Sequence, residues 1–183
     1  MSPSPHPLLS PSPPLKTSQS QTCPAELETL TSVLLKDLPG YANRVIQRAR
    51  RLERTVDNFS YVVVAGKPEF EPLPLGPTQP HSSASQTQEE EPQQVFFTTL
   101  ERSYRRGKVL ESQNFHRLFL IQTADGWRLV TMFSQIGSSQ QGRSPTPPRE
   151  SSNSVIGQAV NIWLRDCRAG TIKDQVKAIN QLP

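Results

Sequence analysis

The chain is poor in the residues and runs that mark several common classes of protein. Its 183 residues include only two cysteines and three histidines. A structural zinc site takes four ligands, and His6, His81 and His116 are too scattered to complete one, so we predict no metal site. No run of about 18 apolar residues occurs either, so no segment is predicted to span a membrane.

The chain is also short of the residues that fill a large core. Hydrophobic residues make up 34%, and 18 prolines stand against nine glycines. This composition favours one compact core with long unstructured passages. We expect a disordered Ser/Pro-rich segment at 1–22, one domain at 23–170 with flexible linkers at 76–92 and 137–149, and a tail at 171–183. The net charge of +4 attracts anionic partners only weakly.

Motifs that define common enzymes are missing as well. There is no G-x-S-x-G, no P-loop and no G-x-G-x-x-G, so we predict no enzyme and no cofactor. His116 is the one histidine in a predicted ordered element, and it could act as a general base oriented by Glu101 or Glu111. We favour the alternative, a strand histidine that is hydrogen-bonded or in contact with water.

What is present begins with an apolar-rich stretch at 115–136, FHRLFLIQTADGWRLVTMFSQI. Asp125 and Gly126 form a turn signal between two β-prone runs, which predicts an antiparallel hairpin. Further strands are predicted at 59–65, at 95–104 and from 109 into the hairpin. Apolar residues on both faces of the 115–121 strand indicate that both faces of the sheet are at least partly covered.

Helices are predicted on either side of these strands. The first begins at Cys23-Pro24 and runs to about Lys36, where Leu38-Pro39-Gly40 breaks it; the second runs on to about Val56. A C-terminal helix starts among 151–154 and stops at Gly170. The predicted fold class is therefore α+β, with two N-terminal helices, an antiparallel sheet of about four strands and one C-terminal helix.

The second predicted helix has an almost wholly arginine polar face. Arg44, Arg48 and Arg51 recur at i, i+4 and i+7, a spacing that could follow phosphates or an anionic membrane surface. Arg102, Arg105, Arg106 and Lys108 could extend this patch. The alternative, which we favour, is a solvated helix face.

Two tryptophans are also candidates for a site. Trp127 and Trp163, with His116, could line a ligand pocket between the sheet and a helix. The commoner role of such residues is to fill the core.

The two cysteines bracket the whole predicted domain. In a reducing compartment, Cys23 and Cys167 are unrelated thiols, with Cys167 a small core residue. In an oxidising one they form a bridge that closes a loop of more than 100 residues, worth about 4–5 kcal/mol in the chain-entropy model. Their positions favour the bridge, and we predict it.

Several stretches taken together resemble a family of small uncharacterised cyanobacterial proteins. The similarity covers about 23–170 and rests on Cys23-Pro24 and on the stretches 34–51, 65–77, 94–104, 118–134 and 163–170, which include LLKDLPGYANRVIQRARR and WLRDCRAG. The resemblance implies export to the periplasm or thylakoid lumen behind a signal peptide, and so favours the disulfide. Residues 1–22 contain no readable signal, so the signal is missing or the start codon misassigned. No activity comes with the resemblance.

The run Asp125–Leu129, DGWRL, is separately similar to the last hairpin of nuclear transport factor 2-like domains. That likeness implies a curved sheet behind N-terminal helices and a small-molecule pocket.

Three functions follow as hypotheses. The first is a non-catalytic, exported domain that acts through contacts with an unknown protein partner. The second is a binder of nucleic acid or an anionic membrane surface through the arginine face of 39–56. The third is a small-molecule-binding domain of the nuclear transport factor 2-like type, with a pocket near His116 and Trp127.

Overall fold

Five antiparallel strands and two helices make up the part of the chain that the computed structural model describes, residues 23–53, 58–71, 91–105, 107–137 and 144–172. The elements run α1 (Leu27–Glu53), β1 (Asn58–Ala65), β2 (Gln93–Arg105), β3 (Lys108–Thr123), β4 (Gly126–Ile136), β5 (Arg149–Glu150) and α2 (Val155–Arg168). The predicted α+β class is confirmed. Of the predicted segments 1–22, 76–92, 137–149 and 171–183, the residues 1–22, 76–90, 138–143 and 173–183 lie outside the described part of the chain.

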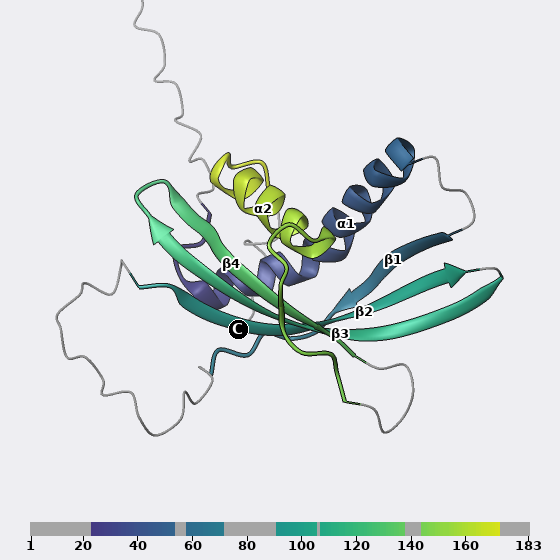
Figure 1. The fold of residues 1–183 in the computed structure, drawn as a ribbon. Helices are drawn as coiled ribbons and strands as arrows, with labels where there is room; N and C mark the ends of the chain where they lie inside the picture. Colours follow the sequence, from purple (N-terminus) through teal and green to yellow (C-terminus); the bar gives the residue numbers. More distant parts are fainter. Residues whose placement is uncertain (1–22, 54–57, 72–90, 106, 138–143, 173–183) are drawn as a thin grey trace, which may run out of the picture.

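The sheet is a meander in which each strand pairs with the next along the chain, in the order β1-β2-β3-β4-β5. The predicted hairpin at 115–136 is confirmed: β3 and β4 pair from Asn114 with Ile136 to Thr123 with Gly126. Gly126 has a φ of 107°, a left-handed conformation that glycine adopts without steric cost. The strands curve strongly, and both helices lie on the concave side (Figure 1).

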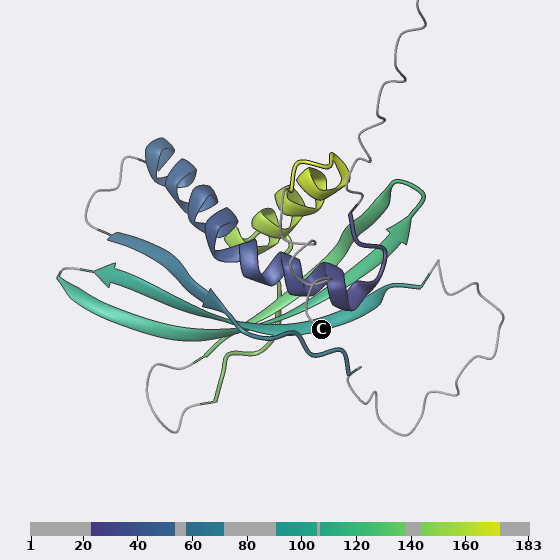
Figure 2. The same ribbon diagram turned by 180° about the vertical axis from the view of Figure 1, so that it is seen from behind.

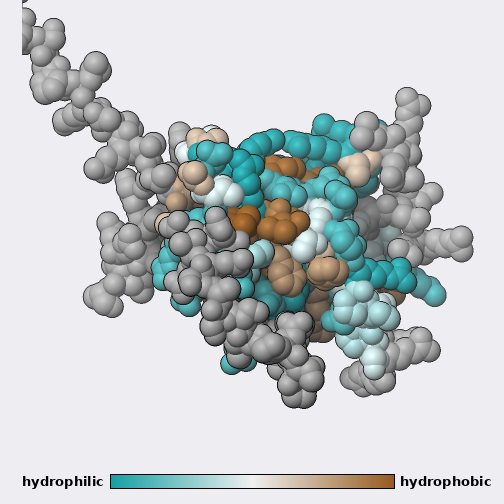
Figure 3. Space-filling model, turned by 60° about the vertical axis from the view of Figure 1, so that its left-hand side comes forward, coloured by the Kyte–Doolittle hydropathy of each residue, from teal (hydrophilic) through white to brown (hydrophobic). Residues whose placement is uncertain are grey.

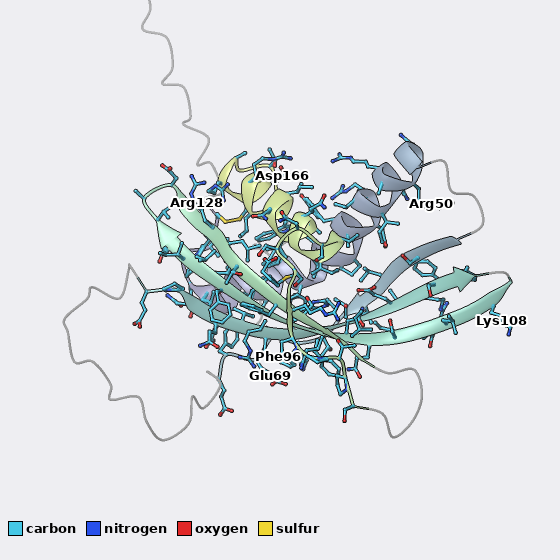
Figure 4. The ribbon with its side chains drawn as sticks, in the orientation of Figure 1. Arg50, Glu69, Phe96, Lys108, Arg128 and Asp166 are labelled. Carbon is cyan, nitrogen blue, oxygen red and sulfur yellow. A yellow bond between two sulfur atoms is a disulfide. The ribbon has the colours of Figure 1, made fainter. Side chains whose placement is uncertain are left out.

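Alternating residues of β2 and β3 give the sheet two different faces. Toward the helices, Phe97, Leu118 and Leu120 are buried with the rest of the core. The other face carries partly exposed aromatic residues, and Figure 4 shows Phe96 on the side of the sheet away from the helices. There Arg117 lies over the Phe96 ring, 5.4 Å from its centre. Among the described residues, both helices thus cover one face only.

The prediction of two N-terminal helices is wrong, because α1 continues through Pro39. Proline removes one helical N–H and clashes with the preceding turn, which normally ends or bends a helix. Here Leu34, Leu38, Ala42 and Val45 form one buried stripe on both sides of the proline, so packing holds the helix together. Figure 2 shows α1 changing direction part-way along, the bend expected of an internal proline.

The predicted count of about four strands also needs correction. Arg149 and Glu150 form β5, at the end of the predicted linker 137–149, and pair with Ser134 and Phe133 of β4. Two residues are too few to give a periodic pattern, so the sequence contains no strand signal there.

The core lies between the helices and the concave face of the sheet. Leu30 and Leu34 of α1, Trp163 of α2, and Leu118 and Met132 of the sheet have 0 or 1% of their surface exposed. Some apolar side chains reach the surface, and Figure 3 shows hydrophobic residues gathered in the middle of one side view, with hydrophilic residues around them. Neither described helix is long and apolar enough to cross a membrane.

Candidate functional site

A cavity of about 410 Å³ lies between the concave face of the sheet and the N-terminal end of α2. Its volume is within the range of small-molecule sites, about 300–1,000 Å³. The sheet supplies a largely polar floor, while α2 and the segment that leads into it supply a wall. The lining residues are Glu101, Asn114, His116, Ser134, Gln135, Ile136, Thr146, Arg149, Ser151, Ser154, Val155 and Ile156.

Strand register brings five of the lining side chains together from three strands. His116 of β3 pairs with Ser134 of β4, and Ser134 pairs with Arg149 of β5. Asn114, two residues before His116 on the same face, pairs with Ile136 of β4. Since directly opposed residues of neighbouring strands project to the same face, all five side chains lie on the helix side of the sheet.

His116 is hydrogen-bonded through both ring nitrogens. Its Nε2 lies 2.8 Å from Thr99 Oγ1, and its Nδ1 lies 2.8 Å from Ser134 Oγ. The side chain is 3% exposed, and this burial lowers the pKa of His116 to about 4. The imidazole is therefore neutral at pH 7, with one ring nitrogen donating and the other accepting.

Hydroxyl groups extend this contact into a chain with two self-consistent proton arrangements. In one, Nε2–H of His116 donates to Thr99, whose hydroxyl donates to Glu101 Oε1 at 3.3 Å, while Nδ1 accepts from Ser134. In the other, Thr99 donates to Nε2 and Nδ1–H donates to Ser134. Ser134 then donates to Ser151 at 2.6 Å. Of the two glutamates predicted to orient His116, Glu101 reaches it through Thr99, whereas Glu111 pairs with Arg102.

The wall of the cavity is fixed by the start of α2. Ser154 is the N-cap, and its side chain accepts a hydrogen bond from Gly157 N at 3.3 Å. A Cβ at Gly157 would lie 2.2 Å from Ser152 O and 2.7 Å from Ser151 O. Only glycine therefore lets the 151–152 backbone pack this closely against the helix, and this contact places the Ser151 hydroxyl beside Ser134.

Asn114 is the polar side chain of the floor whose hydrogen bonding is incomplete. It is 8% exposed, and its Oδ1 is buried with no hydrogen-bond partner among the described residues. A buried polar atom of this kind costs about 1–3 kcal/mol, and such atoms are few in native proteins. Rotation about χ2 lets the amide turn either its oxygen or its nitrogen toward the cavity that it lines.

The predicted pocket residues do not share this cavity. His116 lines it, but Trp127 and Trp163 are 2% and 0% exposed and are part of the core. Trp127 Nε1 donates to the carbonyl oxygens of Pro24 and Ala25, at 3.1 and 3.2 Å. Trp163 Nε1 donates to Asp37 Oδ2 at 3.0 Å and so ties α2 to α1. Both indoles are satisfied structural groups.

The predicted bridge between Cys23 and Cys167 is present, with a sequence separation of 144 residues. It joins the residues just before α1 to the last turn of α2. Trp127 lies close by, because its indole donates to the carbonyl of Pro24, the residue after Cys23. Residues 23 and 24, just before α1, are thus held by the disulfide to α2 and by the Trp127 hydrogen bond to β4.

The arginine face of α1 lies apart from the cavity. Arg44, Arg48 and Arg51 are all exposed, and the Arg44 guanidinium lies 4.2 Å from the centre of the Tyr41 ring. Of the residues predicted to extend this patch, Arg102 pairs with Glu111 on the sheet, and Lys108 lies at the β2–β3 turn (Figure 4). The described side chains of the patch therefore belong to α1.

Sequence reasoning missed most of the cavity. Strand alternation places Asn114 on the face of His116, and that signal was available. Ser151 and Ser154 were recognised only as possible helix caps. Ser134 and Arg149 are neighbours because β5 pairs with β4, and the sequence contains no pattern that predicts β5.

Comparison with models of known protein families, with curated proteins and with solved structures finds no match for this chain.

Proposed function

We propose that this protein is a non-catalytic domain that binds a small organic molecule in the cavity between its sheet and the start of α2. The observation that carries the proposal is the Asn114 amide, buried at the cavity with an unpartnered oxygen. A site built to hydrogen-bond a ligand leaves such a group unpaired when empty, and pays for it in stability. The volume and the mixed polar and apolar lining support the same function.

The state of His116 supports binding rather than catalysis. A general base works best with a pKa near the working pH, whereas burial lowers the pKa of His116 to about 4. Both of its nitrogens already have hydroxyl partners, from Thr99 and Ser134. In this proposal, the histidine fixes the floor of the cavity and turns the Ser134 hydroxyl.

The test is a ligand-observed NMR screen of small molecules against the oxidised protein and two variants. Asn114→Leu removes the unpaired amide, and Val155→Trp puts a large side chain into the cavity wall. We expect hits for the wild type that are lost in both variants. Asn43→Leu is the control, because the Asn43 amide is distant from the cavity and bonded to Val62. Hits that survive Val155→Trp, or no hits at all, would overturn the proposal.

A second candidate function is the binding of an anionic surface through α1. It is favoured by one observation: between Leu38 and Arg51 the helix has four arginines and no acidic residue. The exposed side chains of Arg44, Arg48 and Arg51 make this a local cationic strip, although the whole chain carries only +4. Nucleic acid or an anionic membrane surface is the kind of partner that such a strip attracts.

We further propose that the protein works in an oxidising compartment, the periplasm or thylakoid lumen of the resemblance noted above. The Cys23–Cys167 bridge supports this, because disulfides persist mainly outside the reducing cytosol. The resemblance itself, and the expected protein partner, remain predictions.

A further inference from the structure

The cavity has opposite charges on its two sides. Arg149 of β5 and Glu101 of β2 both line it, and neither forms an ion pair with another described residue. The strands β3 and β4 lie between them, so their backbones are separated by three strand spacings of about 4.8 Å across the sheet. They are also offset along the strands, because Arg149 lies in register with Phe97 of β2, four residues before Glu101. A ligand in the cavity therefore meets a positive group at one side and a negative group at the other.

The start of α2 adds to the positive side. The backbone N–H groups of Val155 and Ile156, which line the cavity, have no acceptor among the described residues. The first turn of the helix contains no acidic residue to offset its dipole. Glu150, the nearest acidic residue before the helix, accepts a hydrogen bond from Ser152 N and does not line the cavity. This side can thus hold an anionic oxygen.

The other side calls for a hydrogen-bond donor. Asn114 Oδ1 is an acceptor without a donor, and the Glu101 carboxylate accepts only, through Thr99 in one proton arrangement. Three apolar residues, Ile136, Val155 and Ile156, also line the cavity. The middle of a ligand is therefore expected to be apolar.

Resting on the proposed function, we infer that the ligand is a short amphiphilic organic acid. Its carboxylate would lie at Arg149 and the start of α2, and its amine or hydroxyl at Asn114 and Glu101. An apolar chain would join the two. The Asn114 amide is independent of the helix terminus, and when its oxygen is turned toward the cavity it accepts from a donor that a simple anion does not have.

The test is calorimetric titration of the full oxidised chain with three matched probes at neutral pH. These are ε-aminocaproic acid, which carries both charges, caproic acid, which has only the carboxylate, and hexylamine, which has only the amine. Because each charge-assisted hydrogen bond is worth about tenfold or more in affinity, we expect the first to bind at least tenfold more tightly than the others.

Two variants test the two ends of the proposed ligand separately. Arg149→Gln should weaken ε-aminocaproic acid and caproic acid about tenfold and leave hexylamine unchanged. Glu101→Gln should weaken ε-aminocaproic acid and hexylamine about tenfold and leave caproic acid unchanged. Arg128→Gln is the control, because Arg128 is exposed at the β3–β4 turn (Figure 4). Equal affinity for all three probes, or equal losses for all three in each variant, would overturn the ligand class but leave the cavity proposal. Failure of every probe and of the broader NMR screen would overturn both.

Discussion

The side-chain amide of Asn43 on α1 holds both backbone groups of Val62 on β1. Its Oδ1 accepts from Val62 N at 2.8 Å, and its Nδ2 donates to Val62 O at 3.0 Å. β1 is an edge strand, and its register with β2 shifts between Val62 and Val64. The amide therefore forms hydrogen bonds with backbone groups of Val62 at this irregular edge of the sheet. Asn114, on the inner strand β3, has no such partner for its oxygen among the described residues.

This contrast predicts opposite effects for one substitution at two positions. Asn114→Leu replaces an unpaired buried amide with an apolar group of similar size, and should raise the free energy of unfolding by about 1 kcal/mol. Asn43→Leu leaves the N–H and C=O of Val62 without these hydrogen-bond partners, and should lower the free energy of unfolding by about 2 kcal/mol. Denaturant unfolding measures both. A destabilised Asn114→Leu would show that the amide has a structural role.

Burial of His116 predicts a pH-dependent stability. The folded protein has a pKa of about 4 at His116 against an ordinary value of 6.5, so between these values the unfolded chain binds the proton and the folded one does not. The free energy of unfolding should then fall as the pH drops from 6.5 to 4, by about 3 kcal/mol in all. In His116→Gln this part of the slope should vanish. Carboxylates titrate in both proteins, so the measurement is the difference between their denaturation curves across this range; parallel curves would contradict it.

Removal of the disulfide should destabilise the domain strongly. Closing a loop across 144 residues is worth about 5 kcal/mol in the chain-entropy model, so Cys23→Ala/Cys167→Ala should lose a large part of the stability. A reducing agent should weaken the wild type and leave the double variant unchanged. Protein isolated from its native compartment should show no free thiol from this pair on alkylation in denaturant; two would count against the bridge.

Two helical glycines predict opposite responses to alanine. A Cβ at Gly157 would lie 2.2 Å from Ser152 O, so Gly157→Ala should cost about 2 kcal/mol by displacing the wall of the cavity. A Cβ at Gly40, in α1, meets nothing within 4 Å, so Gly40→Ala should gain about 1 kcal/mol from helix propensity. Thermal unfolding of the two variants gives the comparison. Equal changes in stability for the two variants would mean that the 151–152 backbone can move to accommodate the added methyl group at little cost.

The arginine face predicts salt-sensitive binding to anionic vesicles. Arg44→Ala/Arg48→Ala/Arg51→Ala should abolish it, and raising the salt from 50 to 200 mM should weaken the wild type at least tenfold, on the order expected when several charges are neutralised. A triple change of the exposed cations Lys67, Lys108 and Arg128 to alanine removes the same charge elsewhere. Equal losses of vesicle binding in the two triple variants would show that binding depends on net charge and not on the arginine face. Binding that does not weaken as the salt concentration rises would rule out electrostatic binding through the arginine face.

Apart from β5, the strands and the helical segments of the fold could be predicted because each has a local pattern. The turn at Asp125-Gly126 and the apolar runs beside it define the central hairpin. The predicted helix break at Pro39 is wrong for a physical reason: proline weakens a helix locally, but the stripe from Leu34 to Val45 packs on both sides of it. Tertiary packing outweighed the local signal.

The cavity could not be predicted in the same way, because it depends on contacts between distant segments. Ser134 meets Ser151 only because the chain returns through β5 to the edge of β4. His116 was a candidate on its own, yet its partners Thr99 and Ser134 come from the two neighbouring strands. Alternation along β3 fixes its face, but strand register decides what surrounds it.

The Cys23–Cys167 bond also determines how the domain would respond to mechanical tension. A pull on the chain from both sides passes directly from one cysteine to the other through the sulfur atoms. The intervening 24–166 segment, with the sheet and the cavity, carries none of that load. While the bond is intact, the domain behaves as a short inextensible link; once it is reduced, the same pull acts on α1, the sheet and α2.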